Sequence, residues 1–221
     1  MGIHNLIEIF AVLLRGLHIT LIVLFASAAF AYSIAFIAGF CQLSRNRVLT
    51  KFTTFYIEVF RGTSLIVQLF WFSYALPGLF GIHLGSDLWA GILAISLNYG
   101  AYMSEIVRSS ILSISKGQTE AALALNLSNF QTMRLIILPQ AVRMMLPEFG
   151  NYFIHMLKAT SLVSLIGLTD ILYYGDIYRS TNLSLSPIVY TMLLAMYFLL
   201  ALPLIGLTRK FERMARKGVA H

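Results

Sequence analysis

The sequence predicts an all-α membrane protein that crosses the bilayer five times. Hydrophobic residues make up 58% of the 221 residues and charged residues only 11%, whereas a soluble globular protein has about 25% charged residues. The mean hydropathy is +0.79. Several apolar runs approach the length of about 20 residues that a helix needs to cross the hydrocarbon core. We therefore expect one domain, residues 1–221, embedded in a membrane.

The limits of the five predicted spans follow from the charged and helix-breaking residues between the apolar runs. The first span contains no Asp, Glu, Lys or Arg, and a basic loop follows it. The second is expected to end before Pro77-Gly78, and the fourth to begin after Pro147. A loop with some local helix is expected over 167–186. In chain order the predicted spans are 17–42, 53–76, 88–111, 149–169 and 187–207.

The basic residues predict the orientation of the chain. Cytoplasmic segments of membrane proteins retain Lys and Arg, which accounts for the net charge of +7 without a nucleic-acid partner. Five spans place the two termini on opposite sides of the membrane. One side carries only Arg15 and Arg179, and we expect the N-terminus there, outside the cell. The cytoplasmic side, with the C-terminus, then carries Arg45, Arg47, Lys51, Arg108, Lys116, Arg134, Arg143, Arg209, Lys210, Arg213, Arg216 and Lys217.

A polar segment, residues 115–139, separates the third and fourth predicted spans. Two Ser-x-x-Gln sequences, which begin at Ser115 and Ser128, have the spacing of capping boxes at helix starts. Asn126 lies between them, and Asn tolerates the left-handed conformation that closes a helix. The segment is therefore expected to form a hairpin of two short helices. The predicted orientation places this hairpin in the cytoplasm, where it is available to a partner protein.

The hairpin resembles the cytoplasmic signature of bacterial ABC-importer permeases. That signature is Glu-Ala-Ala, three residues, Gly, nine residues, Ile, one residue and Leu-Pro. Asn126 stands here in place of the Gly, and Asn tolerates left-handed φ better than most other residues. The matching positions in this chain are Glu120, Ala121, Ala122, Ile136, Leu138 and Pro139.

Three further stretches resemble the polar amino acid branch of these permeases, the histidine and glutamine type. They are residues 58–68, residues 102–108 together with 114–120, and residues 158–162. The resemblance covers about 16–215 and implies a pore subunit of the bacterial cytoplasmic (inner) membrane. It also implies a dimer with a second copy or a sister permease, a cytoplasmic ATPase pair that binds ATP and Mg, and an external solute-binding protein.

The resemblance implies that the hairpin is a coupling helix lying in a groove of the ATPase. Ala121 and Ala122 would allow close approach of the two backbones, and Leu125 would supply an apolar contact. Glu120 would accept hydrogen bonds from the ATPase or cap its own hairpin. Closure of the ATPases on ATP would move the hairpins and rock the helices as rigid bodies.

Charged residues within the predicted spans are the next candidates. Glu58 and Arg61 are three residues apart, as are Glu105 and Arg108, so each pair can meet on one helix face. We expect structural ion pairs, with a gate or a contact in the translocation path as the alternative, because ionisable groups at bilayer depth face protein or water. Lys158 has three alternative roles: it binds a substrate carboxylate, it snorkels to the membrane surface, or it pairs with Glu58 or Glu105 on another span.

Polar residues near these charges complete the candidate translocation path. Asn98 and Tyr102 lie four residues apart and either face a common cavity or form hydrogen bonds between helices. No metal site is expected, because His18 and His155 have no second ligand at metal spacing and are predicted to be packed or hydrogen-bonded between helices. The full set is Arg61, Thr63, Asn98, Tyr102, Lys158, Thr160 and Ser161.

The functional hypothesis is a permease subunit, not an enzyme, that imports a polar amino acid or an amino-acid-like zwitterion. The chain contains no Gly-rich nucleotide-binding loop followed by Lys-Ser/Thr, so another chain must hydrolyse ATP. One alternative is an importer of an unrelated solute. A membrane-embedded enzyme would require clustered catalytic groups, and a scaffold would not explain polar and charged residues on three spans.

Overall fold

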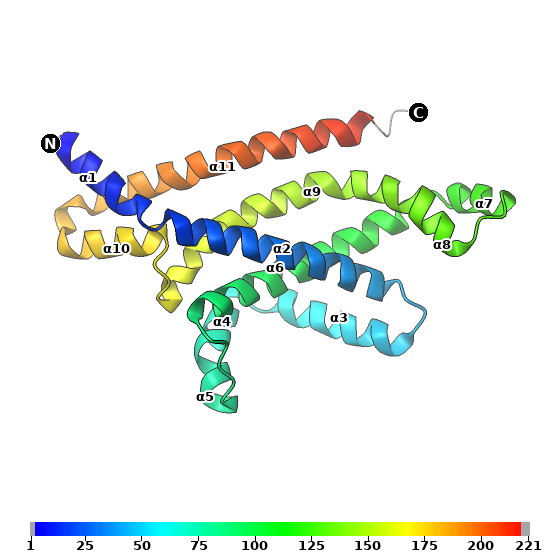
Figure 1. Ribbon diagram of the computed structural model, residues 1–221, viewed down its shortest axis with the longest axis horizontal. Helices are drawn as coiled ribbons and strands as arrows, with labels where there is room; N and C mark the ends of the chain where they lie inside the picture. Colours follow the sequence, from blue (N-terminus) through cyan, green and yellow to red (C-terminus); the bar gives the residue numbers. More distant parts are fainter. Residues whose placement is uncertain (1–2, 218–221) are drawn as a thin grey trace.

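The computed structural model describes residues 3–217, and all the secondary structure in this range is helical (Figure 1). Four long helices run side by side along the long axis of the molecule: α2 (Leu17–Gln42), α6 (Asp87–Leu112), α9 (Leu138–Ala159) and α11 (Ser186–Lys217). Within the described range, two helical stretches are long and apolar enough to cross a membrane, Leu6–Gln42 and Leu183–Ala215, or up to four if each of two bent pairs is one span.

The centre of the bundle is the contact between α2 and α6, where small residues recur every fourth position. On α2 these are Ser27, Ala31, Ala35 and Gly39, and on α6 they are Ser96, Gly100 and Ser104. A Cβ atom on Gly39 would lie 2.7 Å from the Val107 side chain, and one on Gly100 would lie 2.7 Å from the Ile34 side chain. Small residues at this spacing let helix backbones approach closely inside a membrane.

The second predicted span is not one straight helix. It consists of α3 (Arg47–Gly62), α4 (Leu65–Phe70), the π-helix η1 (Trp71–Ala75) and α5 (Leu76–Phe80). The axis bends by 106° between α3 and α4, where Thr63 and Ser64 have extended backbones. Pro77 does not end the helix, which continues from η1 into α5 without a break.

The fourth span also differs from the prediction. The helix begins with α8 (Asn129–Thr132) and the π-helix η2 (Met133–Ile137), continues through α9, and ends in the 3₁₀ helix η3 (Thr160–Ile166). Pro147 therefore lies inside the helix and not before it. Both π-helices end two residues before a proline, Pro77 or Pro139. The proline ring clashes with the carbonyl group four residues earlier, and a wider turn gives that group more room.

The remaining helices lie at the end of the bundle opposite α7 and α8 (Figure 1). The unpredicted helix α1 (Ile3–Leu14) packs on α10 (Ile171–Thr181), which occupies much of the predicted loop and is followed by the 3₁₀ helix η4 (Leu183–Leu185). The fully buried Asp170 accepts hydrogen bonds from the Tyr173 N–H (2.9 Å) and the Tyr197 hydroxyl (3.2 Å), and so joins α10 to α11. α11 continues ten residues beyond the predicted end of the last span.

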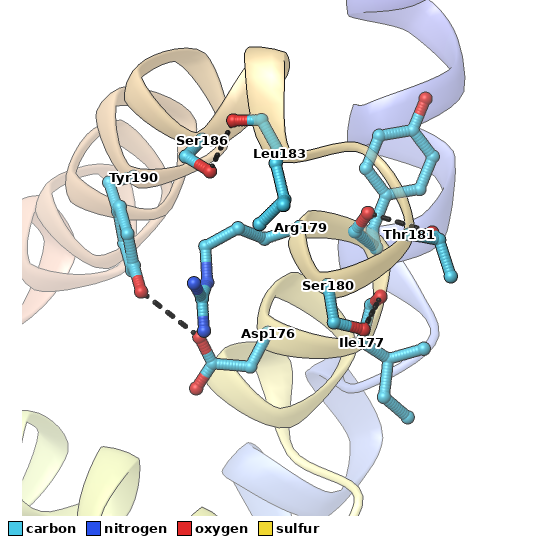
Figure 2. Close-up of polar contacts among 9 residues, drawn as sticks. Asp176, Ile177, Arg179, Ser180, Thr181, Leu183, Ser186 and Tyr190 are labelled. Carbon is cyan, nitrogen blue, oxygen red and sulfur yellow. Dashed lines mark hydrogen bonds and ion pairs between the residues drawn. The ribbon is translucent and has the colours of Figure 1, made fainter.

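A small polar cluster closes the turn between α10 and α11 (Figure 2). The Arg179 Nε atom donates to Asp176 over 3.3 Å, and the Tyr190 hydroxyl donates to the same carboxylate oxygen over 3.2 Å. The Arg179 guanidinium also lies 5.6 Å from the centre of the Tyr190 ring. This cluster links the end of α10 to the first turns of α11.

Candidate functional site

The hairpin predicted from the signature lies at one end of the molecule, next to the ends of α6 and α9 (Figure 1). Helix α7 (Lys116–Ala124) is followed by a turn in which Asn126 has a φ of +54°. The Asn126 N–H donates to the Leu123 carbonyl over 2.9 Å, and the Leu127 N–H donates to the Ala122 carbonyl over 3.1 Å. These are the two hydrogen bonds of a Schellman motif. The prediction of a left-handed residue at Asn126 is confirmed.

The two predicted capping boxes have different outcomes. At Ser128 the box is complete, because the Gln131 N–H donates to Ser128 Oγ and the Ser128 N–H donates to Gln131 Oε1. At Ser115 the hydroxyl accepts from the Gly117 N–H instead, so this box is not formed. The Gln118 side chain accepts a hydrogen bond of 3.5 Å from Gln140 Nε2 and so connects α7 to α9.

The surface of the hairpin presents one acidic and several apolar side chains. Glu120 is exposed and forms no hydrogen bond or ion pair among the described side chains, so it does not cap the hairpin. Leu125 is 72% exposed. Sequence reasoning missed three other exposed apolar residues, Leu123, Phe130 and Leu135. The sequence signal for them was available, because apolar residues in a segment expected to lie in water indicate a surface that a partner covers.

The residues of the signature are not equally accessible. Ala121 is exposed, but Ala122 is fully buried. The prediction that Ala122 allows close approach of a partner is therefore wrong, because its methyl group packs within this chain. Ile136 and Leu138 are half-buried, and Pro139 is exposed in the first turn of α9.

A second candidate site is a cavity of about 380 Å³ at the bend between α3 and α4. It brings together three of the predicted path residues, Thr63, Asn98 and Tyr102. The other residues that line it are Ser64, Leu65, Tyr99, Tyr152 and His155. Tyr99 and Tyr102 are three residues apart on α6, as are Tyr152 and His155 on α9. This helical spacing of aromatic residues was the signal that sequence reasoning missed.

The side-chain amides of Gln68 and Asn98 stabilise the bend between α3 and α4. Gln68 Nε2 donates to the Phe60 carbonyl over 3.0 Å and to the Thr63 hydroxyl over 2.8 Å. Asn98 Nδ2 donates to the same Phe60 carbonyl over 3.0 Å and to Gln68 Oε1 over 3.1 Å. These bonds replace backbone hydrogen bonds that the break removes, as backbone away from water requires. Asn98 thus both lines the cavity and forms hydrogen bonds between helices.

Aromatic rings form much of the cavity wall. The Tyr102 and Tyr152 rings are stacked, with centroids 6.2 Å apart, and the Arg61 guanidinium lies 5.3 Å from the Tyr102 centroid. The Tyr99 hydroxyl donates to the His155 carbonyl over 3.3 Å. His155 is exposed at the cavity, and His18 bonds only its own helix turn, at the Arg15 carbonyl, so neither histidine packs as predicted. No acidic side chain is among the lining residues.

Of the two predicted ion pairs, Glu105–Arg108 is formed and Glu58–Arg61 is not formed among the described side chains. Arg108 Nε donates to Glu105 over 2.9 Å, so this pair is formed. Glu58 and Arg61 are not paired among the described side chains, because the Arg61 side chain lies against Tyr102. Lys158 is exposed and forms no ion pair with Glu58 or Glu105.

Thr160 and Ser161 do not reach the cavity. The Thr160 hydroxyl is buried and donates to the Leu157 carbonyl, and the Ser161 hydroxyl donates to the Lys158 carbonyl. Across the described residues, no group of three His, Cys, Asp or Glu side chains is placed to hold a metal ion.

Comparison with known proteins gives consistent matches along the chain. A probable amino-acid ABC transporter permease of Sinorhizobium fredii is 44% identical over 211 residues, 94% of this chain and 88% of that protein. The glutamine transport system permease of Escherichia coli is 35% identical over 201 residues, 91% of each chain. The crystal structure of an amino acid ABC transporter with histidines has a TM-score of 0.88 at 32% identity, covering 96% of this chain and 98% of that chain.

The family model for the inner membrane component of binding-protein-dependent transport systems matches residues 31–217. This range contains the cavity at the bend, the whole hairpin and, apart from Ser27, the small residues at the contact of α2 with α6. The chain belongs to the family of binding-protein-dependent transport system inner membrane components.

Proposed function

We propose that this chain is the pore-forming permease subunit of an ATP-driven importer for a polar amino acid or a similar zwitterion. Five spans would cross the membrane: α2, the bent pair α3 with α4 and α5, α6, α9 with η3, and α11. The N-terminus would lie outside and the C-terminus in the cytoplasm, as the basic residues indicate. A separate pair of ATPase chains would bind ATP and Mg, and an external solute-binding protein would deliver the substrate.

The observation that carries this proposal is the surface of the hairpin. Its backbone is fixed by the turn at Asn126 and the box at Ser128, yet Leu125 and Phe130 stand exposed on it. Ordered apolar residues next to an unpaired carboxylate at Glu120 are typical of a protein-binding surface. The ATPase would bind here, and motion of the hairpin would reach the spans through α6 and α9.

The cavity at the bend is the proposed substrate site. Its tyrosine rings are suited to a substrate ammonium group, and Arg61, which lies over the Tyr102 ring, would supply positive charge near the cavity for a carboxylate. Because no acidic side chain lines the cavity, an uncharged polar side chain fits better than a cationic one. The named relatives agree with an amino-acid substrate, since one transports glutamine by its name and one was crystallised with histidines.

Charge reversal at the hairpin tests the coupling. In proteoliposomes that contain the complete transporter, Glu120→Lys should reduce substrate uptake at least about tenfold, as the loss of about 1.4 kcal/mol of contact free energy would. The matched control is Glu8→Lys, an exposed charge reversal at the opposite end of the chain. Uptake by the Glu120→Lys protein equal to that of the control would contradict the proposed role of the hairpin.

A further inference from the structure

We propose that a groove between α2, α9 and α11 binds one acyl chain of an anionic phospholipid from the cytoplasmic leaflet, with the lipid phosphate held by basic residues at the cytoplasmic end of the groove. This inference rests on the proposed function in one respect, the orientation of the chain in the membrane. It assigns a ligand to a cavity that lies outside both the hairpin and the proposed substrate site.

The groove is built from three of the long helices. α2 and α11 both pack on α9 (Figure 1), and a space of about 560 Å³ lies between these helices. Small buried residues, Ala28 and Gly150, line its base, and aromatic rings stand along its sides. The Phe25 and Phe153 rings have centroids 5.9 Å apart. Because Phe25 remains 57% exposed, the groove is open to the outside of the molecule.

The groove offers no free hydrogen-bond donor to a polar ligand. No charged or amide side chain lines it, and only two of its lining residues, Tyr32 and Thr208, carry a hydroxyl. The Tyr32 hydroxyl donates to the Phe149 carbonyl over 3.0 Å, and the Thr208 hydroxyl donates to the Leu204 carbonyl over 2.9 Å. An amino acid would leave its charged groups without partners here, at a large cost in free energy. A hydrocarbon chain meets no such cost.

The groove and the proposed substrate cavity lie on different sides of α9. Phe149 and Phe153 line the groove, whereas Tyr152 and His155 line the cavity. Residues three or four apart share one side of a helix, so each pair defines one side. The groove therefore faces away from the solute path and would meet the lipid of the bilayer.

Basic residues adjoin the cytoplasmic end of the groove on two helices. Arg143 follows the lining residue Val142 on α9, and Arg209 and Lys210 lie between two lining residues of α11. All three are exposed and form no ion pair among the described side chains. Glu212 is the acidic residue next to them, so three positive charges stand against one negative charge. Basic residues between helices on the cytoplasmic side bind anionic lipid headgroups.

The length of the groove matches one leaflet. From Val142 to Phe153, α9 rises by about 16 Å at 1.5 Å per residue, which is half of a hydrocarbon core of about 30 Å. With the basic residues at the cytoplasmic surface, the other end of the groove would lie near the middle of the bilayer. An acyl chain of the cytoplasmic leaflet ends at that depth.

Native mass spectrometry of the complete transporter tests the choice of lipid. With phosphatidylglycerol and phosphatidylcholine of identical acyl chains added in equal amounts, retained phosphatidylglycerol should exceed phosphatidylcholine at least about tenfold. Arg143→Gln should reduce the retained phosphatidylglycerol about fivefold, the factor for one basic residue, and leave phosphatidylcholine unchanged. The matched control is Arg47→Gln, an exposed arginine on α3. Equal retention of the two lipids, or the same retention by Arg143→Gln and Arg47→Gln, would overturn the proposal.

Filling the groove tests the acyl-chain site. Ala29 is an exposed lining residue of α2, so Ala29→Phe places a ring where the chain would lie and should reduce the retained phosphatidylglycerol at least about tenfold. Ala195→Phe, at an exposed position of α11 outside the groove, is the matched control, and equal retention by the two variants would contradict the site. If Ala29→Phe does not fold, the exposed change Arg143→Gln decides. A disulfide dimer through Ala29→Cys, in a chain that also carries Cys41→Ala, would show that a second copy covers the groove and would overturn the lipid assignment.

Amino-acid uptake by the unchanged transporter, reconstituted with the same lipids, separates this inference from the proposed function. Uptake without preferential retention of phosphatidylglycerol contradicts the lipid site but leaves the transport proposal unaffected. Preferential retention together with failure to take up any amino acid supports the lipid site and contradicts the transport proposal.

Discussion

At the residue scale, Asn126 is held in a conformation that few side chains tolerate. Its φ of +54° is the only positive value among the described non-glycine residues. We expect Asn126→Val to destabilise the hairpin by about 1–2 kcal/mol, because a left-handed backbone brings Cβ close to the following carbonyl oxygen, whereas Asn126→Gly should be neutral. Limited proteolysis in detergent, with cleavage mapped to residues 115–139, measures the difference.

One result of the same proteolysis experiment would contradict the prediction for Asn126. If Asn126→Val and Asn126→Gly are cleaved at the same rate as the unchanged protein, the turn does not depend on the left-handed residue. Asn129→Val, an exposed change three residues further along, serves as the control for the loss of an amide.

Gln68 is the residue on which the bend between α3 and α4 depends. Gln68→Leu keeps the side-chain volume nearly constant but removes the donor that Gln68 Nε2 provides to the Phe60 carbonyl and to the Thr63 hydroxyl. The Phe60 carbonyl then keeps only the hydrogen bond from Asn98. Loss of satisfied hydrogen bonds at a buried site costs about 1–3 kcal/mol, so the thermal midpoint in detergent should fall.

The Gln68 prediction includes an internal check. Because Asn98 bonds Gln68 and the same carbonyl, Gln68→Leu and Asn98→Leu belong to one network. The double variant should lose less stability than the sum of the single losses. Strict additivity would show that the two amides act independently.

Local sequence was sufficient for some residues but not for others. Asn126 and Ser128 were predictable because their partners lie within five residues. The position of Arg61 was not, because its partner Tyr102 lies 41 residues away on another helix, and the expected pairing with Glu58 was the nearer choice. Ala122 was misjudged for the same reason: burial depends on what the fold brings to a residue.

At the scale of helices, the crossing of α9 and α11 depends on Gly150. A Cβ atom there would lie 2.6 Å from the Thr208 hydroxyl oxygen and 2.8 Å from its methyl group. Gly150→Ala should destabilise the protein by about 1–3 kcal/mol through overpacking, measured as a lower thermal midpoint in detergent. Gly206→Ala is the matched control, because nothing lies within 4 Å of its Cβ position. A Gly150→Ala midpoint at or above that of Gly206→Ala would show that the helices can move apart at no cost.

Helix limits were predictable where charge sets them. The limits of α2 and α6 agree with 17–42 and 88–111 to within one residue, because polar residues flank both. The bend at Thr63 was not predictable, since the amides that stabilise it come from α4 and α6. The continuation of the helix through Pro147 was also missed, as was α1. A proline or a short amphipathic stretch does not by itself determine whether a helix continues or forms, because this depends on packing against other helices.

At the scale of the whole molecule, orientation is the property that the sequence predicts and labelling can measure. Cys41 is the single cysteine, so Cys41→Ala provides a cysteine-free background. In it, Leu183→Cys and Leu125→Cys introduce thiols at nearly equally exposed positions, 71% and 72%. Leu183 follows α10 and Leu125 follows α7, and these two helices lie at opposite ends of the molecule (Figure 1). A membrane-impermeant maleimide added to intact spheroplasts should label Leu183→Cys and not Leu125→Cys. Permeabilised membranes should label both. The reverse pattern would invert the proposed topology.

The short connection between α6 and the hairpin has a mechanical consequence. α6 ends at Leu112 and α7 begins at Lys116, so little slack separates the hairpin from a helix of 26 residues that is packed tightly against α2. At 1.5 Å per residue this helix is about 39 Å long. As a stiff lever it would convert a tilt of about 10° at the hairpin into about 7 Å of travel at its far end. The small side chains between α2 and α6 would thus determine how much of the hairpin's motion reaches the far end of α6. Any sliding of one helix along the other would be subtracted from that displacement.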